Sequence, residues 1–296
     1  MRVGTVERLR RYPVKSMLGE ELREAAVTER GITGDRAYAL LDAETGRVVS
    51  AKHPRLWAGM LGFTAATAAD GTVALTGADG GAVDEGDLSE RLGRKVRLVS
   101  EPPEGATIQR SVPDEVLARG IEAEVDFTVN ELGRGAPPGT FFDFAPLHLL
   151  STAGLAAADG AAADGAAADG AAADGAEVGA EVGAEVDGVA AERYRPNLVI
   201  RTAGAAEGFV ENGWVERELA VGAELRLHVV TATPRCAVPT LAHGPLPRAT
   251  AALRTLGERN RLVPLPGMPA LPCIGVYARV LAPGRVRVGD AVVLRS

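Results

Sequence analysis

Short stretches in which apolar and polar residues alternate recur along most of the chain. Residues 224–230 alternate with the period of two that a strand requires. Pro234 should end this strand, because proline has no amide N–H for a sheet hydrogen bond. Further strands are expected at residues 37–41, 47–50, 72–75, 95–99, 277–281 and 286–288, with hairpins joining the first two and the last two.

Helical periodicity is limited to two places. Residues 249–261 place Ala252, Leu253 and Leu256 on one stripe, and residues 88–92 are long enough for one helical turn. Many short strands with few helices favour barrels or sandwiches over a parallel α/β sheet. The pattern therefore predicts a mainly β fold of the α+β class.

A low-complexity repeat of alanine, glycine and acidic residues occupies residues 156–188. It begins with four copies of Ala-Ala-Ala-Asp-Gly, a period of five that matches neither a helix nor a strand. The segment has almost nothing to bury. A spacing or partner-binding arm is one interpretation. We favour a surface loop, because lengthening a flexible loop costs little free energy.

The acidic residues of this repeat account for the net charge of the protein. The formal charge is −7, and the repeat holds eight acids and no lysine or arginine, so the remaining chain has a formal charge of +1. A near-neutral chain gives no indication of a nucleic-acid surface or of a trap for acidic substrates.

The length of 296 residues is typical of about two domains, and the Pro/Gly-rich residues 101–105 suggest a boundary. We therefore expect domains at 1–103 and 104–296. The first thirty residues lack the apolar stretch of a secretory signal, and no apolar run reaches the roughly 18 residues of a membrane span. Two cysteines in such a chain predict reduced thiols and a cytoplasmic location.

Cys236 is the first candidate for a catalytic or metal-binding residue. It follows the predicted end of the strand at Pro234, where loops held by a rigid scaffold often carry functional residues. The neighbouring Arg235 would favour the thiolate form that binds metals. On these facts alone, however, a lone cysteine is better interpreted as a small buried side chain.

Several short motifs in a fixed order change that interpretation. They are Tyr-Pro-Val-Lys-Ser at 12–16, Gly-Ile-Thr-Gly-Asp-Arg at 31–36, Tyr-Arg-Pro-Asn-Leu-Val-Ile at 194–200, Thr-Pro-Arg-Cys at 233–236, Gly-Val-Tyr-Ala-Arg-Val at 275–280 and Pro-Gly-Arg-Val-Arg-Val-Gly-Asp at 283–290. The ordered set closely resembles the MOSC family, which is named after the C-terminal domain of molybdenum-cofactor sulfurase and includes the mitochondrial amidoxime-reducing component and its bacterial relatives. The resemblance covers nearly the whole chain outside 156–188. It implies an N-terminal MOSC-associated β-barrel domain packed on a MOSC β-barrel domain.

The resemblance also implies a cofactor, molybdenum held by the dithiolene of a phosphorylated pterin (Mo-molybdopterin). Cys236 matches the metal ligand and catalytic cysteine of the family, with Thr233 and Arg235 in the same cofactor-binding motif. A thiolate is an apt ligand for a soft metal centre. Cys273, the competing thiol, lies in an apolar run and is expected to pack in the core.

Polar residues of the other motifs match contacts to the rest of the cofactor. Lys15, Ser16 and Arg36 match the phosphate contacts, where cations and a planar guanidinium are suited to bind an anion, although a solvated surface pair is the alternative for the two cations. The resemblance implies pterin contacts by four further residues, namely Arg195, Asn197, Ser151 and Thr152. A helix cap is an equally good interpretation of the last two. His148 is the one histidine that we single out.

The resemblance implies an oxidoreductase that reduces N-hydroxylated small molecules by oxygen-atom transfer at molybdenum. A carrier of the cofactor or of sulfur, and a molybdenum-dependent biosynthetic tailoring enzyme, are the alternatives. The chain has neither the cysteine spacing of an iron–sulfur cluster nor a dinucleotide-binding motif. We therefore expect a separate flavin or iron–sulfur reductase as the electron donor.

Overall fold

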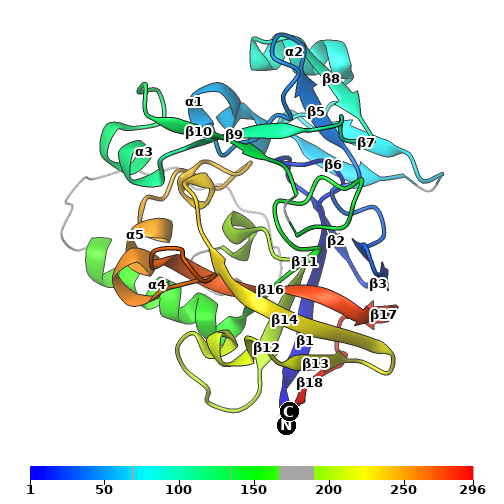
Figure 1. Ribbon diagram of the computed structural model, residues 1–296, viewed down its shortest axis with the longest axis vertical. Helices are drawn as coiled ribbons and strands as arrows, with labels where there is room; N and C mark the ends of the chain where they lie inside the picture. The colour runs from blue at the N-terminus through cyan, green and yellow to red at the C-terminus, as the bar shows by residue number, and fades with distance from the viewer. Residues whose placement is uncertain (69, 134, 167–189, 296) are drawn as a thin grey trace.

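The computed structural model describes residues 1–68, 70–133, 135–166 and 190–295, and a closed barrel of seven strands forms its centre (Figure 1). Around the barrel the strands are β11 (Leu147–Ser151), β12 (Leu198–Thr202), β1 (Arg2–Arg11), β18 (Ala291–Arg295), β13 (Glu218–Val221), β14 (Leu225–Pro234) and β16 (Leu271–Ala282). Pairing of β16 with β11 closes the ring. The expected mainly β fold with a barrel is confirmed.

The barrel interior explains the alternation seen in the sequence. In β14, Leu225, Leu227 and Val229 are fully buried, whereas the residues between them are partly exposed. Successive side chains of a strand point to opposite faces, so one face of each strand fills the barrel. Leu9 of β1 and Val276 of β16 belong to the same buried cluster.

Residues from the N-terminal half form a second region above one end of the barrel in Figure 1. Its elements are β5 (Ala39–Asp42), α1 (Pro54–Trp57), η1 (Ala58–Gly62), β6 (Thr64–Thr67), β7 (Val73–Thr76), α2 (Glu85–Leu92) and β8 (Val96–Val99). They enclose a core of their own, which includes Leu40, Trp57 and Leu88. Strand β1, however, precedes this region in the chain and belongs to the barrel.

The remaining elements surround these two regions. They are β2 (Glu20–Leu22), β3 (Glu24–Thr28), β4 (Gly31–Ile32), β9 (Thr107–Ser111), α3 (Pro113–Arg119), β10 (Phe127–Glu131), α4 (Thr152–Ala166), η2 (Ala191–Tyr194), η3 (Val210–Trp214), η4 (Val238–Thr240), α5 (Ala251–Arg259), β15 (Arg261–Leu262) and β17 (Gly284–Arg287). None of the helices in the described ranges is long and apolar enough to cross a membrane.

Three local predictions need correction. Residues 286–288 do not pair with 277–281, because β17 pairs with β3 instead. A Cβ atom at Gly284 would lie 2.8 Å from the backbone nitrogen of Leu225, so the chain passes close to β14 as it leaves β16. The hairpin expected between 37–41 and 47–50 is present only as a short pairing, an antiparallel bridge from Val48 to Leu41 with flanking backbone hydrogen bonds, and the full partner of β5 is β8.

The third correction concerns the start of the repeat, which was expected to be a loop. Helix α4 extends through Ala166 and so includes the first repeat units. Alanine has the highest helix propensity, and the buried Ala158 packs in one cluster with Leu256 of α5, which the isolated sequence could not show. Residues 167–188, the rest of the repeat, lie outside the described residues.

Candidate functional site

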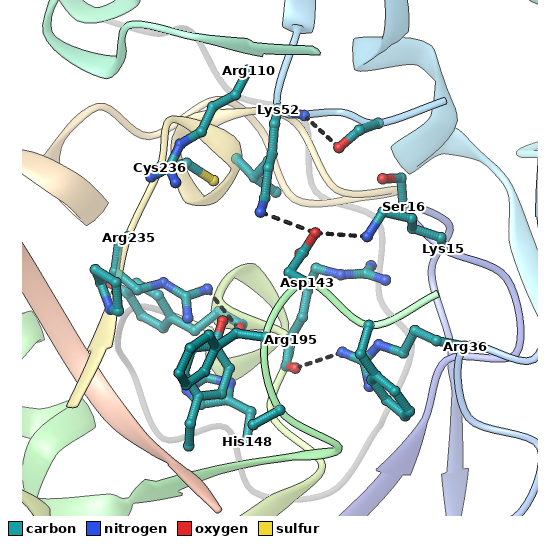
Figure 2. Close-up of a pocket in the computed structure, with 18 of the residues that line it drawn as sticks. Lys15, Ser16, Arg36, Lys52, Arg110, Asp143, His148, Arg195, Arg235 and Cys236 are labelled. Atoms are coloured by element: carbon teal, nitrogen blue, oxygen red, sulfur yellow. Dashed lines mark hydrogen bonds and ion pairs between the residues drawn. The ribbon is translucent and has the colours of Figure 1, made fainter. Parts of the chain in front are cut away.

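A cavity of about 250 Å³ is lined both by the N-terminal region and by loops around the barrel (Figure 2). Seven of the ten residues predicted from the sequence line it, namely Lys15, Ser16, Arg36, Arg195, Asn197, Arg235 and Cys236. They come from segments that are up to about 220 positions apart in the chain. The fold therefore gathers most of the predicted site into one place.

Cys236 lies just beyond the end of β14, as the position of Pro234 predicted. It is a free cysteine that is 9% exposed, and it packs in one cluster with Ala51, Val238 and Leu241. Among the described residues, no three His, Cys, Asp or Glu side chains gather closely enough to hold a metal ion. A metal bound to Cys236 would therefore need further ligands from outside these side chains.

An ion triad, formed by the buried Lys15, the half-buried Lys52 and the exposed Asp143, lies in the cavity wall. Lys15 Nζ donates to Asp143 Oδ1 at 2.7 Å and to the carbonyl of Phe141 at 2.9 Å, while Lys52 Nζ lies 3.0 Å from the same Oδ1 (Figure 2). Burial lowers the pKa of Lys15 to about 8, against the opposing effect of Asp143. Partial desolvation would raise the pKa of Asp143, but the charges of Lys15 and Lys52 outweigh it and hold that pKa below its usual range.

The triad bears on one of the two interpretations of Lys15, that of a solvated surface cation. The residue is 4% exposed, so it is not a solvated surface cation. At neutral pH two ammonium groups face one carboxylate, which leaves an excess of positive charge in the cavity wall. Such an excess favours binding of an anion.

Strained backbone conformations concentrate at this cavity. In the described ranges only four residues other than glycine have φ in the left-handed region, and three of them, Ser16 (65°), Arg36 (45°) and Arg195 (56°), line the cavity. This region is unfavourable for side chains with a Cβ atom, and strain of this kind persists where surrounding contacts impose it. The aromatic ring of Tyr12 contacts both guanidinium groups, since its centroid lies 4.5 Å from Cζ of Arg36 and 4.4 Å from Cζ of Arg195.

Asn197 and His148 connect the cavity to the barrel wall. The Asn197 side chain accepts a hydrogen bond from the His148 amide at 3.1 Å and donates to Asp35 at 2.9 Å. Burial holds the pKa of His148 well below its usual range, so its ring is neutral at pH 7. Both residues therefore contribute dipoles rather than charge to the cavity.

Arg235 contributes a donor with no partner. Its Nη2 donates to the carbonyl of Tyr194 at 2.8 Å, whereas its buried Nε has no hydrogen-bond partner in the described chain. A buried donor without a partner costs free energy, which a ligand that accepts a hydrogen bond there would recover.

The other three predicted residues do not line the cavity. The Ser151 hydroxyl accepts from the Gly154 amide at 2.8 Å at the start of α4 and donates to the buried Glu211 carboxylate. Thr152 hydrogen-bonds to Thr202 at 2.8 Å. For Ser151 the geometry supports the helix-cap interpretation, whereas the Thr152 hydroxyl bonds to Thr202 of β12 and not to the backbone of α4. Thr233 is fully buried, and its hydroxyl has no partner among the described residues.

Sequence reasoning missed Lys52, Arg110, Asp143 and Tyr277, all of which line the cavity. Asp143 had a usable signal, because it is the one acid within a Phe-Phe-Asp-Phe run and an acid among aromatic residues needs a buried partner. Lys52 and Arg110 carried no such sequence signal, because single basic residues are common on protein surfaces.

Comparison with known families gives two matches. The MOSC N-terminal beta barrel domain matches residues 3–94, and the MOSC domain matches residues 170–293. No curated protein matches the chain. The first match contains Lys15 and Arg36 and the second contains Arg195 and Cys236, so the cavity joins the two matched regions. The chain therefore belongs to the MOSC family, whose domain is associated with the molybdenum cofactor.

Proposed function

We propose that this cavity binds the molybdenum cofactor, with Cys236 as a protein ligand to the metal. The observation that carries the proposal is that the fold brings one free thiol and a group of cations, from the two matched regions, to a single cavity. In this arrangement Lys15, Ser16 and Arg36 hold the phosphate, and Arg195 and Asn197 face the pterin.

The donor groups of the cavity fit such a ligand. The Ser16 hydroxyl accepts from the Ala51 amide at 3.1 Å, which leaves its own proton available for a phosphate oxygen. The unpartnered Nε of Arg235 is available to a polar pterin or dithiolene atom. The left-handed backbone at Ser16, Arg36 and Arg195 supports a site organised before the ligand binds.

For the reaction we propose reduction of N–O bonds in N-hydroxylated small molecules. The N–O bond is broken, two electrons and two protons are consumed, and the oxygen leaves as water. The bound cofactor supplies a metal centre that accepts oxygen and passes electrons. The chain supplies a water-poor, cationic cavity that orients the substrate beside Cys236.

For the electrons we propose a second protein, a separate flavin or iron–sulfur reductase. The sequence has two cysteines and no dinucleotide-binding glycine motif, which supports this dependence. Purified protein with NADH alone should leave an N-hydroxylated substrate unchanged, whereas reduced methyl viologen should support turnover. Steady NADH-dependent turnover by the protein alone would contradict the proposal.

The decisive experiment measures molybdenum content together with turnover. Protein purified from molybdate-supplied cells should contain about one molybdenum per chain and should reduce benzamidoxime to benzamidine with reduced methyl viologen. Metal that is bound but released quickly to an apo-enzyme, without turnover, would favour a cofactor carrier. Absence of molybdenum would overturn the proposed binding itself.

A further inference from the structure

Positive charge in the cavity exceeds what its own carboxylate can neutralise. The cations that line it are Lys15, Arg36, Lys52, Arg110, Arg195 and Arg235, and in the described chain the lining contains one acid, Asp143. An excess of cations in a partly enclosed space favours an anionic ligand. The phosphate of the proposed cofactor is one such anion, and it would neutralise the cations that lie near it.

The partners of these cations single out Arg110. Lys15 and Lys52 share Asp143, and Arg36 pairs with Asp35. Arg195 donates to the Met17 carbonyl at 2.6 Å, and Arg235 donates to a carbonyl as described above. Within the described residues, the guanidinium of Arg110 alone among the six makes no hydrogen bond or ion pair.

The position of Arg110 separates it from the phosphate end of the cavity. Figure 2 shows Ser16, Lys15 and Arg36 on one side of Asp143, whereas Arg110 reaches in from the other side toward Cys236. Arg110 lies on β9, outside both regions that the family models match. Its guanidinium is therefore placed near the proposed reaction centre rather than near the proposed phosphate.

The wall that shares this cavity with Arg110 is also apolar and aromatic. Phe144, Leu265, Met268 and Tyr277 line it, and the rings of Phe144 and Tyr277 lie 5.5 Å apart. Met268 is 38% exposed, which places an apolar side chain where a ligand could cover it. Such a wall is suited to the flat body of an aromatic molecule.

We infer that Arg110 is a specificity-determining residue that binds an anionic group of the substrate, and that the preferred substrates are aromatic N-hydroxylated compounds carrying a carboxylate. The inference rests on the proposed function for the identity of the reacting N–O group. A guanidinium binds a carboxylate through two parallel hydrogen bonds, so Arg110 fixes orientation as well as affinity. It orients the N–O group toward Cys236 while the ring packs against the aromatic wall.

The kinetic test compares benzamidoxime with 4-carboxybenzamidoxime, which differ only in the anionic group. With reduced methyl viologen as the reductant, the wild-type holoenzyme should show a kcat/KM ratio of about tenfold or more in favour of the carboxylate. Arg110→Gln should bring this ratio close to one, and Arg110→Lys should keep part of it. Arg97→Gln makes the same change at an exposed arginine on β8 outside the cavity and should leave the ratio unchanged.

An equilibrium measurement separates this inference from the proposed function. Titration calorimetry of the protein as purified should show that benzoate binds more tightly than benzamide, and that Arg110→Gln removes the difference while Arg97→Gln does not. If molybdenum is bound but neither amidoxime is reduced, the proposed reaction fails and this titration alone decides the role of Arg110. A wild-type ratio near one, a preference that survives Arg110→Gln, or a loss of molybdenum from that variant would overturn the inference.

Discussion

Cys236 and Cys273 are both buried and lie on paired segments of the same barrel wall, yet only Cys236 lines the cavity. Strands β14 and β16 place Pro234 opposite Cys273, only two residues before Cys236. Cys236 lies beyond the end of its strand and lines the cavity, whereas Cys273 is fully buried within its strand. The Cys273 thiol contacts the Leu271 carbonyl at 3.2 Å, and burial raises its pKa to about 11.

The difference shows that the end of a strand, rather than the residue type, decides which thiol is available for chemistry. Within β16 the ladder continues past Cys273 and both faces are covered. At Pro234 the ladder of β14 stops, and the chain turns into a loop that opens onto the cavity. A functional residue at the end of a strand combines a fixed position with access to a ligand.

Exchanging each cysteine for alanine tests this contrast most strongly. Cys236→Ala should lower molybdenum content and amidoxime turnover by about 100-fold or more, since loss of even an outer-shell partner typically costs 10–100-fold at a metal site. Cys273→Ala should retain both properties. Elemental analysis and steady-state kinetics on the two variants provide the measurement. A Cys236→Ala protein with full molybdenum content would show that Cys236 is not the metal ligand.

Local pattern was sufficient to predict β14, the strands at 72–75 and 95–99, and helix α5, because each of these depends on alternation or helical spacing within a few residues. Partners distant in the chain were not predictable. Strand β17 pairs with β3, and β1 belongs to the barrel although it precedes the N-terminal region. Neither pairing can be recognised from the sequence of the strand itself, because each partner is distant in the chain.

The candidate site shows the same limit. The motifs indicated Lys15, Arg36 and Cys236, and the structure brings them to one cavity. Composition gave no sign of the positive cavity, because a chain that is nearly neutral outside its repeat can still concentrate cations at one place. Lys52 and Arg110 could be found only from the fold, since they reach the cavity from different loops and strands.

Chemical modification should show a smaller difference between Cys236 and Cys273, in the rate at which each thiol reacts. At pH 8 a thiol with a pKa of about 11 is ionised to about 0.1%, so Cys273 should react with iodoacetamide only after unfolding. Cys236 lines the cavity and should be the first residue modified in protein from which the cofactor has been removed. Peptide mass spectrometry over time distinguishes the two sites. Faster labelling of Cys273 in the folded protein would contradict the burial argument.

The smallest expected effect is on stability. Cys273→Ala should lower the free energy of unfolding at pH 7.5 by about 1 kcal/mol, because alanine leaves part of the packed site empty. The difference should narrow at pH 10. Folding raises the pKa of Cys273 from its ordinary value of 9.0 to about 11, so its contribution is complete below pH 9 and is lost as the pH rises toward 11.

Urea unfolding of wild-type and Cys273→Ala protein at both pH values measures the difference in their free energies of unfolding. The wild-type protein should lose stability between pH 7.5 and pH 10 by more than the variant does, since only the wild type has a thiol at 273 that ionises more readily when unfolded. Leu253→Ala on α5 removes another buried side chain but no titrating group, and it should give the same destabilisation at both pH values. A gap between wild type and Cys273→Ala that stays constant with pH would show that the Cys273 thiol ionises as freely in the folded barrel as in the unfolded chain.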